Sequence, residues 1–318
     1  MAARVASVLK VYQISLLEGE YRVLRVLILG GSGMLGHKLF QVCTERFDAY
    51  ATVRGPARAY EYDGLFDSSR IIGNVAANDL DSILKATASV QPSVIVNCIG
   101  VVKQDAAAKD PLTSIFINSL LPHRLARVCS AAAARLIHLS TDCVFSGRRG
   151  NYAEDDPSDA EDPYGKTKYL GEVTGANCLT LRTSMIGREL HGSHGLLEWF
   201  LSQQGKSVRG FRRAIFSGFT TRALAEIIAW IISDHPELEG VYHVAAEPIS
   251  KSDLLTLIKE TGALNIQIEP DDTFHCDRSL NGARFCEATG FVPPAWSDMI
   301  SQLFQDPTPY TEIRRSHC

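Results

Sequence analysis

Short apolar runs alternate with longer amphipathic segments through roughly the first 190 residues of the chain. The apolar runs are rich in valine, isoleucine and leucine, which is typical of parallel strands that are buried on both faces. The segments between them carry apolar residues at helical spacing. The expected strands are 26–29, 50–53, 70–73, 93–98, 135–140 and 179–183, and the expected helices are 37–46, 78–88, 114–134 and 164–174. This alternation predicts an α/β fold built on a doubly wound parallel sheet.

The alternation becomes irregular after about residue 184. Expected helices at 196–202, 221–233 and 252–260 are separated by a Gly/His loop at 188–195, a basic and aromatic stretch at 209–218 and a strand at 240–244. We therefore expect a sheet domain at 23–184 and a smaller mixed α/β lobe at 185–318, parts of which return to the sheet. Residues 1–22 form a poor secretory signal, and we expect a loosely held extension or a non-native start.

A glycine turn joins the first expected strand to the first helix with the sequence G-G-S-G-M-L-G. Gly30 would let the chain turn sharply, Gly33 would let backbone approach a pyrophosphate, and Gly36 would let the helix pack closely. The helix N-terminus offers unpaired N–H groups and a positive dipole end to phosphates. The strand before the turn and the helix after it argue against a ligand-free glycine turn. The pattern predicts a Rossmann-type NAD(P) domain whose cofactor contacts include Gly30, Gly33, Met34 and Leu35.

Arg54 ends the second expected strand, about twenty residues past the glycine turn. Folds of this type hold the adenosine ribose at that place, and an acidic residue there would bind a free 2′-hydroxyl. An arginine pairs well with phosphate instead. The sequence thus favours NADP(H) over NAD(H), although Arg54 could be an ordinary surface arginine.

Tyr164 and Lys168 are four residues apart in an expected helix, so their side chains share one face. A nearby ammonium favours phenolate, so we expect Lys168, helped by the nicotinamide charge, to lower the pKa of Tyr164. Such a phenol can donate a proton to a carbonyl oxygen. Thr141, at the end of the neighbouring strand, can donate a hydrogen bond to the same oxygen. The spacing alone would fit a surface pair, but the upstream glycine turn favours a catalytic role.

These motifs together resemble those of the extended short-chain dehydrogenases/reductases, and within them the dTDP-4-dehydrorhamnose reductases and related sugar-nucleotide reductases. The matching segments are L-I-L-G-G-S-G-M-L-G (27–36), V-I-V-N-C-I-G (94–100), I-N-S-L-L-P (117–122), H-L-S-T-D-C-V-F-S-G (138–147), Y-G-K-T-K-Y-L-G-E (164–172) and L-R-T-S (181–184). The later half matches only through R-S-L (278–280) and T-G-F-x-P-P-A-W (289–296).

The resemblance implies hydride transfer from NADPH, or from NADH, to C4 of a 4-keto-6-deoxyhexose on a nucleoside diphosphate. Tyr164 would be the acid, Lys168 would orient the ribose and tune Tyr164, and Thr141 would polarise the ketone. Further expected cofactor contacts are Asn97, Cys98, Gly100, Asn118 and Ser140. Expected substrate contacts are Lys103, Asp142, Cys143, Phe145, Arg188, Trp199, Ser217 and Arg278, with Arg212 and Arg213 as further candidates for the diphosphate.

Two departures from related families refine this expectation. Sugar-nucleotide 4,6-dehydratases carry Thr-Asp-Glu at this strand end, where the two carboxyl groups eliminate water, whereas this chain has Thr141-Asp142-Cys143. The missing carboxylate disfavours dehydration. The run V-V-K-Q (101–104) replaces an alanine-rich run of the rhamnose-pathway reductases, which weakens any transfer of their particular sugar and nucleotide.

Composition excludes several other classes. The formal net charge of -4 gives nucleic-acid binding no electrostatic support, and no apolar run is long enough to span a bilayer. The eight cysteines include no C-x-x-C pair, so a cytoplasmic protein without a disulfide framework is expected. His191 and His194 lie in a Gly/Ser-rich loop without a third ligand, so we expect no metal.

Three functions remain open after this reading. The first is an NADPH-dependent sugar-nucleotide 4-ketoreductase, which would supply precursors of deoxysugars and surface polysaccharides and could act as a homodimer. The second is an epimerase of the same fold that retains NAD⁺, against which Arg54 argues. The third is a non-catalytic NADP-binding regulatory subunit, since a fold alone does not prove activity.

Overall fold

The computed structural model describes residues 14–17, 20–61, 65–102 and 110–315, with side chains from residue 23 onward. Within the expected N-terminal extension, β1 (Ile14–Leu17) and β2 (Glu20–Val23) pair as an antiparallel ribbon. None of the helices in the described part of the chain combines the length and apolar character that crossing a membrane requires.

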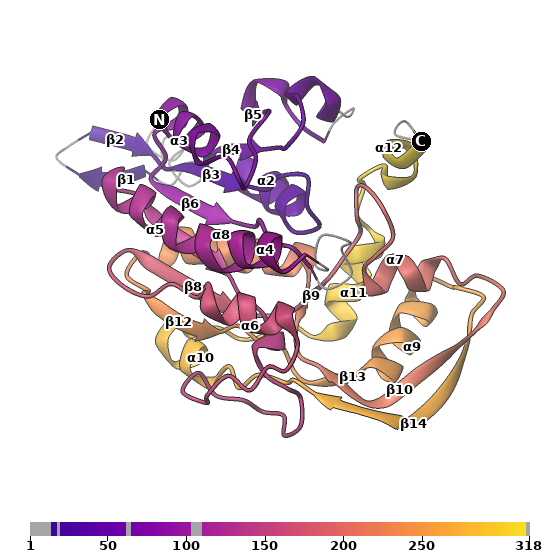
Figure 1. Cartoon of the computed structure of the whole chain (residues 1–318). Helices are drawn as coiled ribbons and strands as arrows, with labels where there is room; N and C mark the ends of the chain where they lie inside the picture. Colours follow the sequence, from indigo (N-terminus) through magenta and orange to yellow (C-terminus); the bar gives the residue numbers. More distant parts are fainter. Residues whose placement is uncertain (1–13, 18–19, 62–64, 103–109, 316–318) are drawn as a thin grey trace, which may run out of the picture.

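A seven-stranded sheet, parallel throughout, forms the centre of the molecule (Figure 1). From one edge to the other its strands are β5 (Ile71–Ile72), β4 (Asp48–Thr52), β3 (Arg25–Leu29), β6 (Val94–Asn97), β7 (Arg135–Leu139), β8 (Cys178–Arg182) and β12 (Gly240–His243). Within this sheet the first strand in sequence is β3. The chain continues outward through β4 to β5 and then crosses to β6 on the other side of β3. The predicted doubly wound sheet is confirmed, and its switch point lies between β3 and β6, where such sheets bind ligands.

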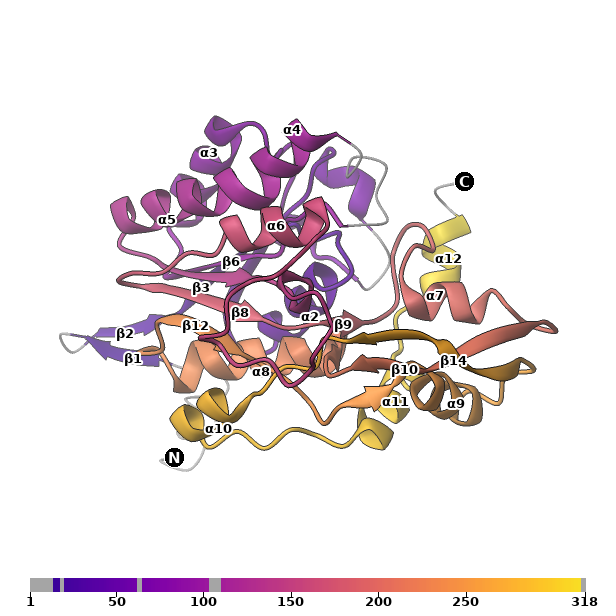
Figure 2. The same ribbon diagram turned by 60° about the horizontal axis from the view of Figure 1, so that its bottom comes forward.

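The two faces of the sheet bury alternate residues of each strand. Leu27 and Leu29 of β3 pack toward α3 (Leu80–Val90) and α5 (Leu121–Ala131). Val26 and Ile28 belong to a larger core shared with α2 (Gly36–Thr44) and α8 (Thr221–Asp234). Figure 2 shows these two helical layers on opposite sides of the strands. Because both faces are covered, the strands read as continuous apolar runs.

The long helix expected at 114–134 is broken into three pieces. Asp110 caps α4 (Pro111–Ser114), a π-helical segment η4 (Ile115–Leu120) follows, and α5 continues from it. A π-helical turn is rare and is often found at functional sites, and this one carries Asn118. The helix expected at 164–174 is shorter, since α6 (Pro163–Leu170) stops before Gly171.

A second, smaller sheet lies beside the carboxyl ends of the central strands (Figure 2). It consists of β13 (Ile249–Ser250), β10 (Ser207–Phe216) and β14 (Gln267–Asp277), flanked by α7 (Leu196–Leu201) and α9 (Lys251–Thr261). The sequence did not indicate β14. Most of its side chains are exposed or half-buried, so it lacks the alternation that marks a half-buried strand.

The remaining elements are short connections and the C-terminal helices. They are η1 (Ala57–Tyr60), η2 (Ser68–Arg70), η5 (Asp142–Val144), β9 (Met185–Ile186), β11 (Phe219–Thr220), α10 (Ala283–Thr289), α11 (Trp296–Phe304) and α12 (Tyr310–Arg315). The chain returns at its end, so that α12 lies beside α7 in both views (Figures 1 and 2).

Candidate active site

A cavity of about 840 Å³ lies between the carboxyl ends of the central strands and the second sheet. Its walls on the sheet side follow β3, β6, β7 and β8, and its opposite wall comes from β10, β14 and the start of α9. The lining residues include Gly33, Met34, Leu35, Arg54, Cys98, Gly100, Ser140, Thr141, Asp142, Cys143, Tyr164, Lys168 and Arg278. Residues expected to contact cofactor and residues expected to contact substrate thus share one cavity.

The glycine turn has the geometry expected of a phosphate-binding loop. Gly30 has φ of +86°, which favours glycine. A Cβ on Gly36 would lie 2.1 Å from the carbonyl oxygen of Gly30, so only glycine allows α2 to start this close to the turn. No side chain caps the N-terminus of α2. Its first N–H groups therefore remain suited to an anion.

Tyr164, Lys168 and Thr141 all line this cavity, and the Tyr164 and Thr141 side chains are hydrogen-bonded to each other. Asp162 accepts a hydrogen bond from the backbone N–H of Gly165 and so caps α6, which starts at Pro163. The Lys168 ammonium is 5% exposed and donates to the Leu139 carbonyl oxygen over 2.5 Å. This contact attaches the helix to the end of β7, from which Thr141 follows.

Burial lowers the pKa of Lys168 to about 8, although Glu172 and Cys98 act in the opposite direction. The Glu172 carboxylate that raises this pKa is itself paired with Arg182, and among the described residues no ion pair joins Lys168 to a carboxylate. A buried ammonium without a counter-ion favours binding of an anionic or hydroxyl-rich ligand beside it.

The expectation that the pKa of Tyr164 is lowered is wrong for the protein alone. Burial raises the pKa of this phenol, and the nearby Cys143 and Asp142 raise it further, while the Thr141 hydroxyl lowers it. The phenol is therefore protonated at neutral pH, which is the form that can donate a proton.

Two buried asparagines support the cavity without lining it. Asn118 is 1% exposed, accepts from the N–H of Val101 over 2.9 Å and donates to the carbonyl oxygen of Val101 over 3.0 Å. Asn97 bonds to His138 and to the N–H of Ile99. The structure thus places both behind the loops that carry Cys98, and their direct contact with the cofactor stays a prediction.

Residues 24–306 of the chain match the family described as "RmlD substrate binding domain". The chain belongs to this family. This match confirms the resemblance to dTDP-4-dehydrorhamnose reductases, and so do the relatives described next.

Relatives of this chain include a sugar-nucleotide ketoreductase and proteins with other names. "Spore coat polysaccharide biosynthesis protein SpsK" of Bacillus subtilis is 28% identical over 89% of this chain and 97% of its own. "Probable dTDP-4,6-dihydroxy-2-methyloxan-3-one 4-ketoreductase" of Streptomyces antibioticus is 32% identical over 69% of this chain and 70% of its own. "Methionine adenosyltransferase 2 subunit beta" of Rattus norvegicus is 30% identical over 46% of this chain and 41% of its own. The predicted enzyme class, oxidoreductase, agrees with the reductase relatives.

The solved structure of dTDP-4-dehydrorhamnose reductase from Bacillus anthracis, determined in complex with NADP, has a similar fold. It covers 90% of this chain and all of its own, with a TM-score of 0.72 and 22% identity. At that identity the likeness shows the fold alone.

On the substrate side, the structure of this RmlD-family chain brings Asp142, Cys143 and Arg278 to the cavity. Arg278 donates to the carbonyl oxygen of Phe145 over 2.8 Å and approaches the sulfur of Cys143 at 3.8 Å. These contacts fix the guanidinium against the cavity wall. Among the described residues no carboxylate forms an ion pair with Arg278, so its charge is available to an anionic ligand.

Four other predicted substrate contacts of the RmlD-family chain lie away from the cavity. Phe145 is fully buried and stacks on Tyr152. Ser217 is buried and accepts from the N–H of Leu280. Trp199 is 40% exposed on α7, outside the cavity lining. Arg188 pairs with the buried Glu198.

The remaining predicted contacts either lie outside the described residues or point to other partners than the cavity. Lys103 lies outside the described residues. The exposed Arg212 pairs with Asp272, and Arg213 does not line the cavity. Ser140 does line it, but its hydroxyl donates to Glu172 over 2.7 Å rather than to the open space.

The sequence did not indicate several parts of the cavity lining. Lys251 begins α9 and Phe274 lies on β14, the strand that the sequence did not indicate. The loop 189–196 also lines the cavity, beside the glycine turn. Its Gly/His composition marked a loop but gave no indication of where the loop packs. Within the described ranges no cluster of three or more His, Cys, Asp or Glu side chains is placed to hold a metal ion.

Proposed function

We propose that this protein is an NADP(H)-dependent reductase that converts the 4-keto group of a nucleoside-diphosphate 4-keto-6-deoxyhexose into a hydroxyl group. The observation that carries the proposal is that Tyr164, Lys168 and Thr141 line the same cavity as the glycine turn. We further propose that residues 23–184 bind the cofactor and that residues 185–318 mainly form the substrate side.

The described residues fit a nicotinamide dinucleotide. The close approach at Gly36 and the uncapped start of α2 suit its pyrophosphate. Arg54 is exposed at the same cavity and suits a ribose phosphate, which favours NADP(H). Cys98 and Gly100, which follow β6, would contact the cofactor beyond the pyrophosphate. The bound reduced nicotinamide supplies a hydride.

The residues of this chain supply the proton and the electrostatics. Tyr164 is held protonated by burial and donates its proton to the oxygen that becomes the product hydroxyl. The Thr141 hydroxyl donates a hydrogen bond to the same oxygen. Lys168 keeps a positive charge near the phenol below about pH 8, which stabilises the phenolate left after proton transfer.

The opposite wall of the cavity suits a diphosphate and a nucleoside. Arg278 and Lys251 both line it, and two cations are the natural partners of a diphosphate. Phe274 is 47% exposed on the same wall and offers an aromatic face for a base. Cys143 stands where a dehydratase would need a carboxylate, which argues against elimination of water.

The test presents dTDP- and UDP-linked 4-keto-6-deoxy sugars to the purified protein with NADPH. The proposal expects loss of NADPH absorbance with at least one of them and a product with one new hydroxyl group at C4. Purified protein that carries tightly bound, stoichiometric NAD⁺ and interconverts two hydroxy sugars would favour an epimerase instead.

A second candidate follows from the relative named "Methionine adenosyltransferase 2 subunit beta". A protein of this family could bind a dinucleotide and act as a subunit of another enzyme. NADPH binding without turnover of any keto sugar, together with a stable complex with another protein, would favour this candidate over the reductase.

A further inference from the structure

The end of the described chain connects two walls of the cavity. We name residues 306–315 the C-terminal strap; it comprises the turn at Asp306–Thr308 and α12. The family match ends at residue 306, so nearly all of the strap lies beyond it. None of its residues lines the cavity. Any influence on a ligand must therefore pass through the elements that the strap contacts.

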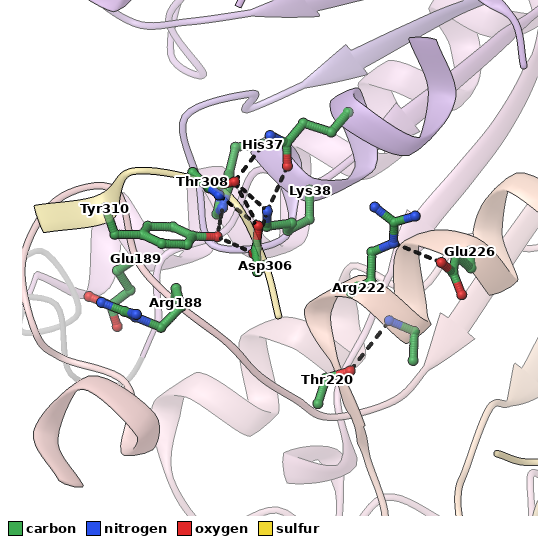
Figure 3. Close-up of polar contacts among 12 residues, drawn as sticks. His37, Lys38, Arg188, Glu189, Thr220, Arg222, Glu226, Asp306, Thr308 and Tyr310 are labelled. Carbon is green, nitrogen blue, oxygen red and sulfur yellow. Dashed lines mark hydrogen bonds and ion pairs between the residues drawn. The ribbon is translucent and has the colours of Figure 1, made fainter. Parts of the chain in front are cut away.

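The first attachment of the strap is to the start of α2, directly after the glycine turn (Figure 3). The buried Lys38 ammonium lies 2.5 Å from the Asp306 carboxylate and donates to the Thr308 hydroxyl over 2.8 Å. His37 lies with Nε2 2.9 Å from the Tyr310 hydroxyl and with Nδ1 2.8 Å from the carbonyl oxygen of Gly33. A hydrogen-bonded chain thus runs from α12 to the glycine turn.

The second attachment is to the segment 188–198. Arg314 donates through Nε and Nη2 to the carbonyl oxygen of Glu189 over 3.0 and 2.5 Å, and through Nη1 to Glu198 over 2.7 Å. The guanidinium of Arg188 lies 4.7 Å from the centre of the Tyr310 ring. Figure 3 shows Arg188 and Glu189 on the side of Tyr310 away from α2.

The loop held in this way packs beside the glycine turn. The Glu189 carboxylate accepts from the N–H groups of His194 and Gly195 over 3.1 and 2.5 Å, which closes the loop on itself. A Cβ on Gly195 would lie 2.8 Å from the Met34 side chain. Residues 189–191 and 194–196 line the same cavity as residues 32–35. The loop therefore forms the part of the cavity wall next to the place where a pyrophosphate would lie.

We propose that Tyr310 and Arg314 are positioning residues for the dinucleotide: the C-terminal strap holds the loop 189–195 against the glycine turn and so shapes the cofactor side of the cavity before the ligand arrives. This inference rests on the proposed function. A wall that is already ordered need not be ordered by the ligand, which improves affinity. Because such coupling is reciprocal, cofactor binding also stabilises the strap.

The first test measures NADPH dissociation constants of full-length variants by titration. Arg314→Ala removes the loop anchor but leaves Glu198 paired with Arg188, so the protein keeps its buried ion pair. We expect a dissociation constant about tenfold higher, equivalent to about 1.4 kcal/mol. Tyr310→Phe keeps the ring over which Arg188 lies and loses only the hydroxyl contacts. For this variant we expect an NADPH dissociation constant about threefold higher.

The matched control is Arg315→Ala, which removes an exposed arginine of the same helix. An unchanged constant for Arg314→Ala, or an equal loss in Arg315→Ala, would overturn the proposal.

The second test needs no variant and keeps the proposal testable if Arg314→Ala does not fold. Hydrogen exchange of the wild-type protein is compared with and without NADPH. We expect slower exchange of the amides of α12, which line no part of the cavity. Binding of NADPH that leaves α12 exchange unchanged contradicts the strap but not the reductase. A wild-type protein that binds neither NADPH nor NADH overturns the proposed function and, with it, the basis of this inference.

Discussion

Two buried lysines of this chain have opposite surroundings. Lys38, on α2, is 2% exposed and pairs with the Asp306 carboxylate, whereas Lys168, on α6, is 5% exposed and contacts the carbonyl oxygen of Leu139. Burial lowers the pKa of both. The ion pair holds Lys38 and the C-terminal strap together, while Lys168 faces a cavity. A buried cation that already has its carboxylate stabilises the fold, and one that lacks it is suited to a ligand.

The largest expected effect comes from breaking the ion pair between Lys38 and Asp306. Lys38→Met leaves the largely buried Asp306 without its counter-ion, and we expect the free energy of unfolding to fall by about 3 kcal/mol or more. Lys168→Met removes a charge that burial already disfavours. We therefore expect the free energy of unfolding to fall by less than about 1 kcal/mol, or to rise. Urea denaturation at pH 7 measures both. An equal loss in the two variants would remove the distinction between the lysines.

The next effect concerns the chemistry beside Lys168. Tyr164→Phe keeps the ring and removes the proton donor, and we expect turnover to fall by about a hundredfold or more. The NADPH dissociation constant should stay within about twofold, because the phenol proton is needed only when the carbonyl oxygen is reduced. Steady-state kinetics and a cofactor titration separate the two. Unchanged turnover would remove Tyr164 from its proposed role.

The pH dependence of stability sharpens the comparison further. The pKa of Lys168 is about 8 in the folded protein, below the 10.5 of an ordinary lysine. The unfolded chain therefore binds more protons between these values, and the Lys168 contribution to stability rises with pH in that window. The difference in unfolding free energy between wild type and Lys168→Met should rise by at most about 1.4 kcal/mol per pH unit from pH 8 to pH 10. A difference in unfolding free energy that does not change between pH 8 and pH 10 would contradict the lowered pKa of Lys168.

The smallest expected effect lies at the mouth of the cavity. Arg54→Ala should weaken NADPH binding by about tenfold and leave NADH binding nearly unchanged, since only NADPH carries the ribose phosphate. Paired titrations with the two reduced cofactors measure this. Equal weakening of both would assign Arg54 to general electrostatic attraction, and no weakening would remove it from the cofactor site.

The sequence predicted the parts of this fold that depend on local pattern. The strand runs, the glycine turn and the spacing of Tyr164 and Lys168 are short-range signals. The structure forms the strands into one sheet and places the glycine turn, Tyr164 and Lys168 around one cavity. The direction of the Tyr164 pKa shift was wrong because burial, which spacing does not reveal, raises the pKa by more than the Thr141 hydroxyl lowers it.

The parts that the sequence did not predict depend on contacts between distant residues. The His37–Tyr310 contact joins residues 273 positions apart, and no local pattern links them. The exposed strand β14 carries no apolar alternation, so Phe274 and the cavity wall around it were missed. We predicted Arg188 as a diphosphate ligand because the sequence shows its charge. The sequence does not show that Glu198 pairs with Arg188 in the fold and neutralises that charge.

Hydride transfer is the central claim, and isotope transfer tests it most directly. NADPH carrying deuterium at the transferable position of the nicotinamide is incubated with the protein and a dTDP- or UDP-linked 4-keto-6-deoxy sugar, and the product is analysed by mass spectrometry and NMR. The account predicts one deuterium bound to C4 of the sugar, with loss of the label from the cofactor. A product without deuterium, or labelled NADPH recovered unchanged with every keto sugar, would contradict it.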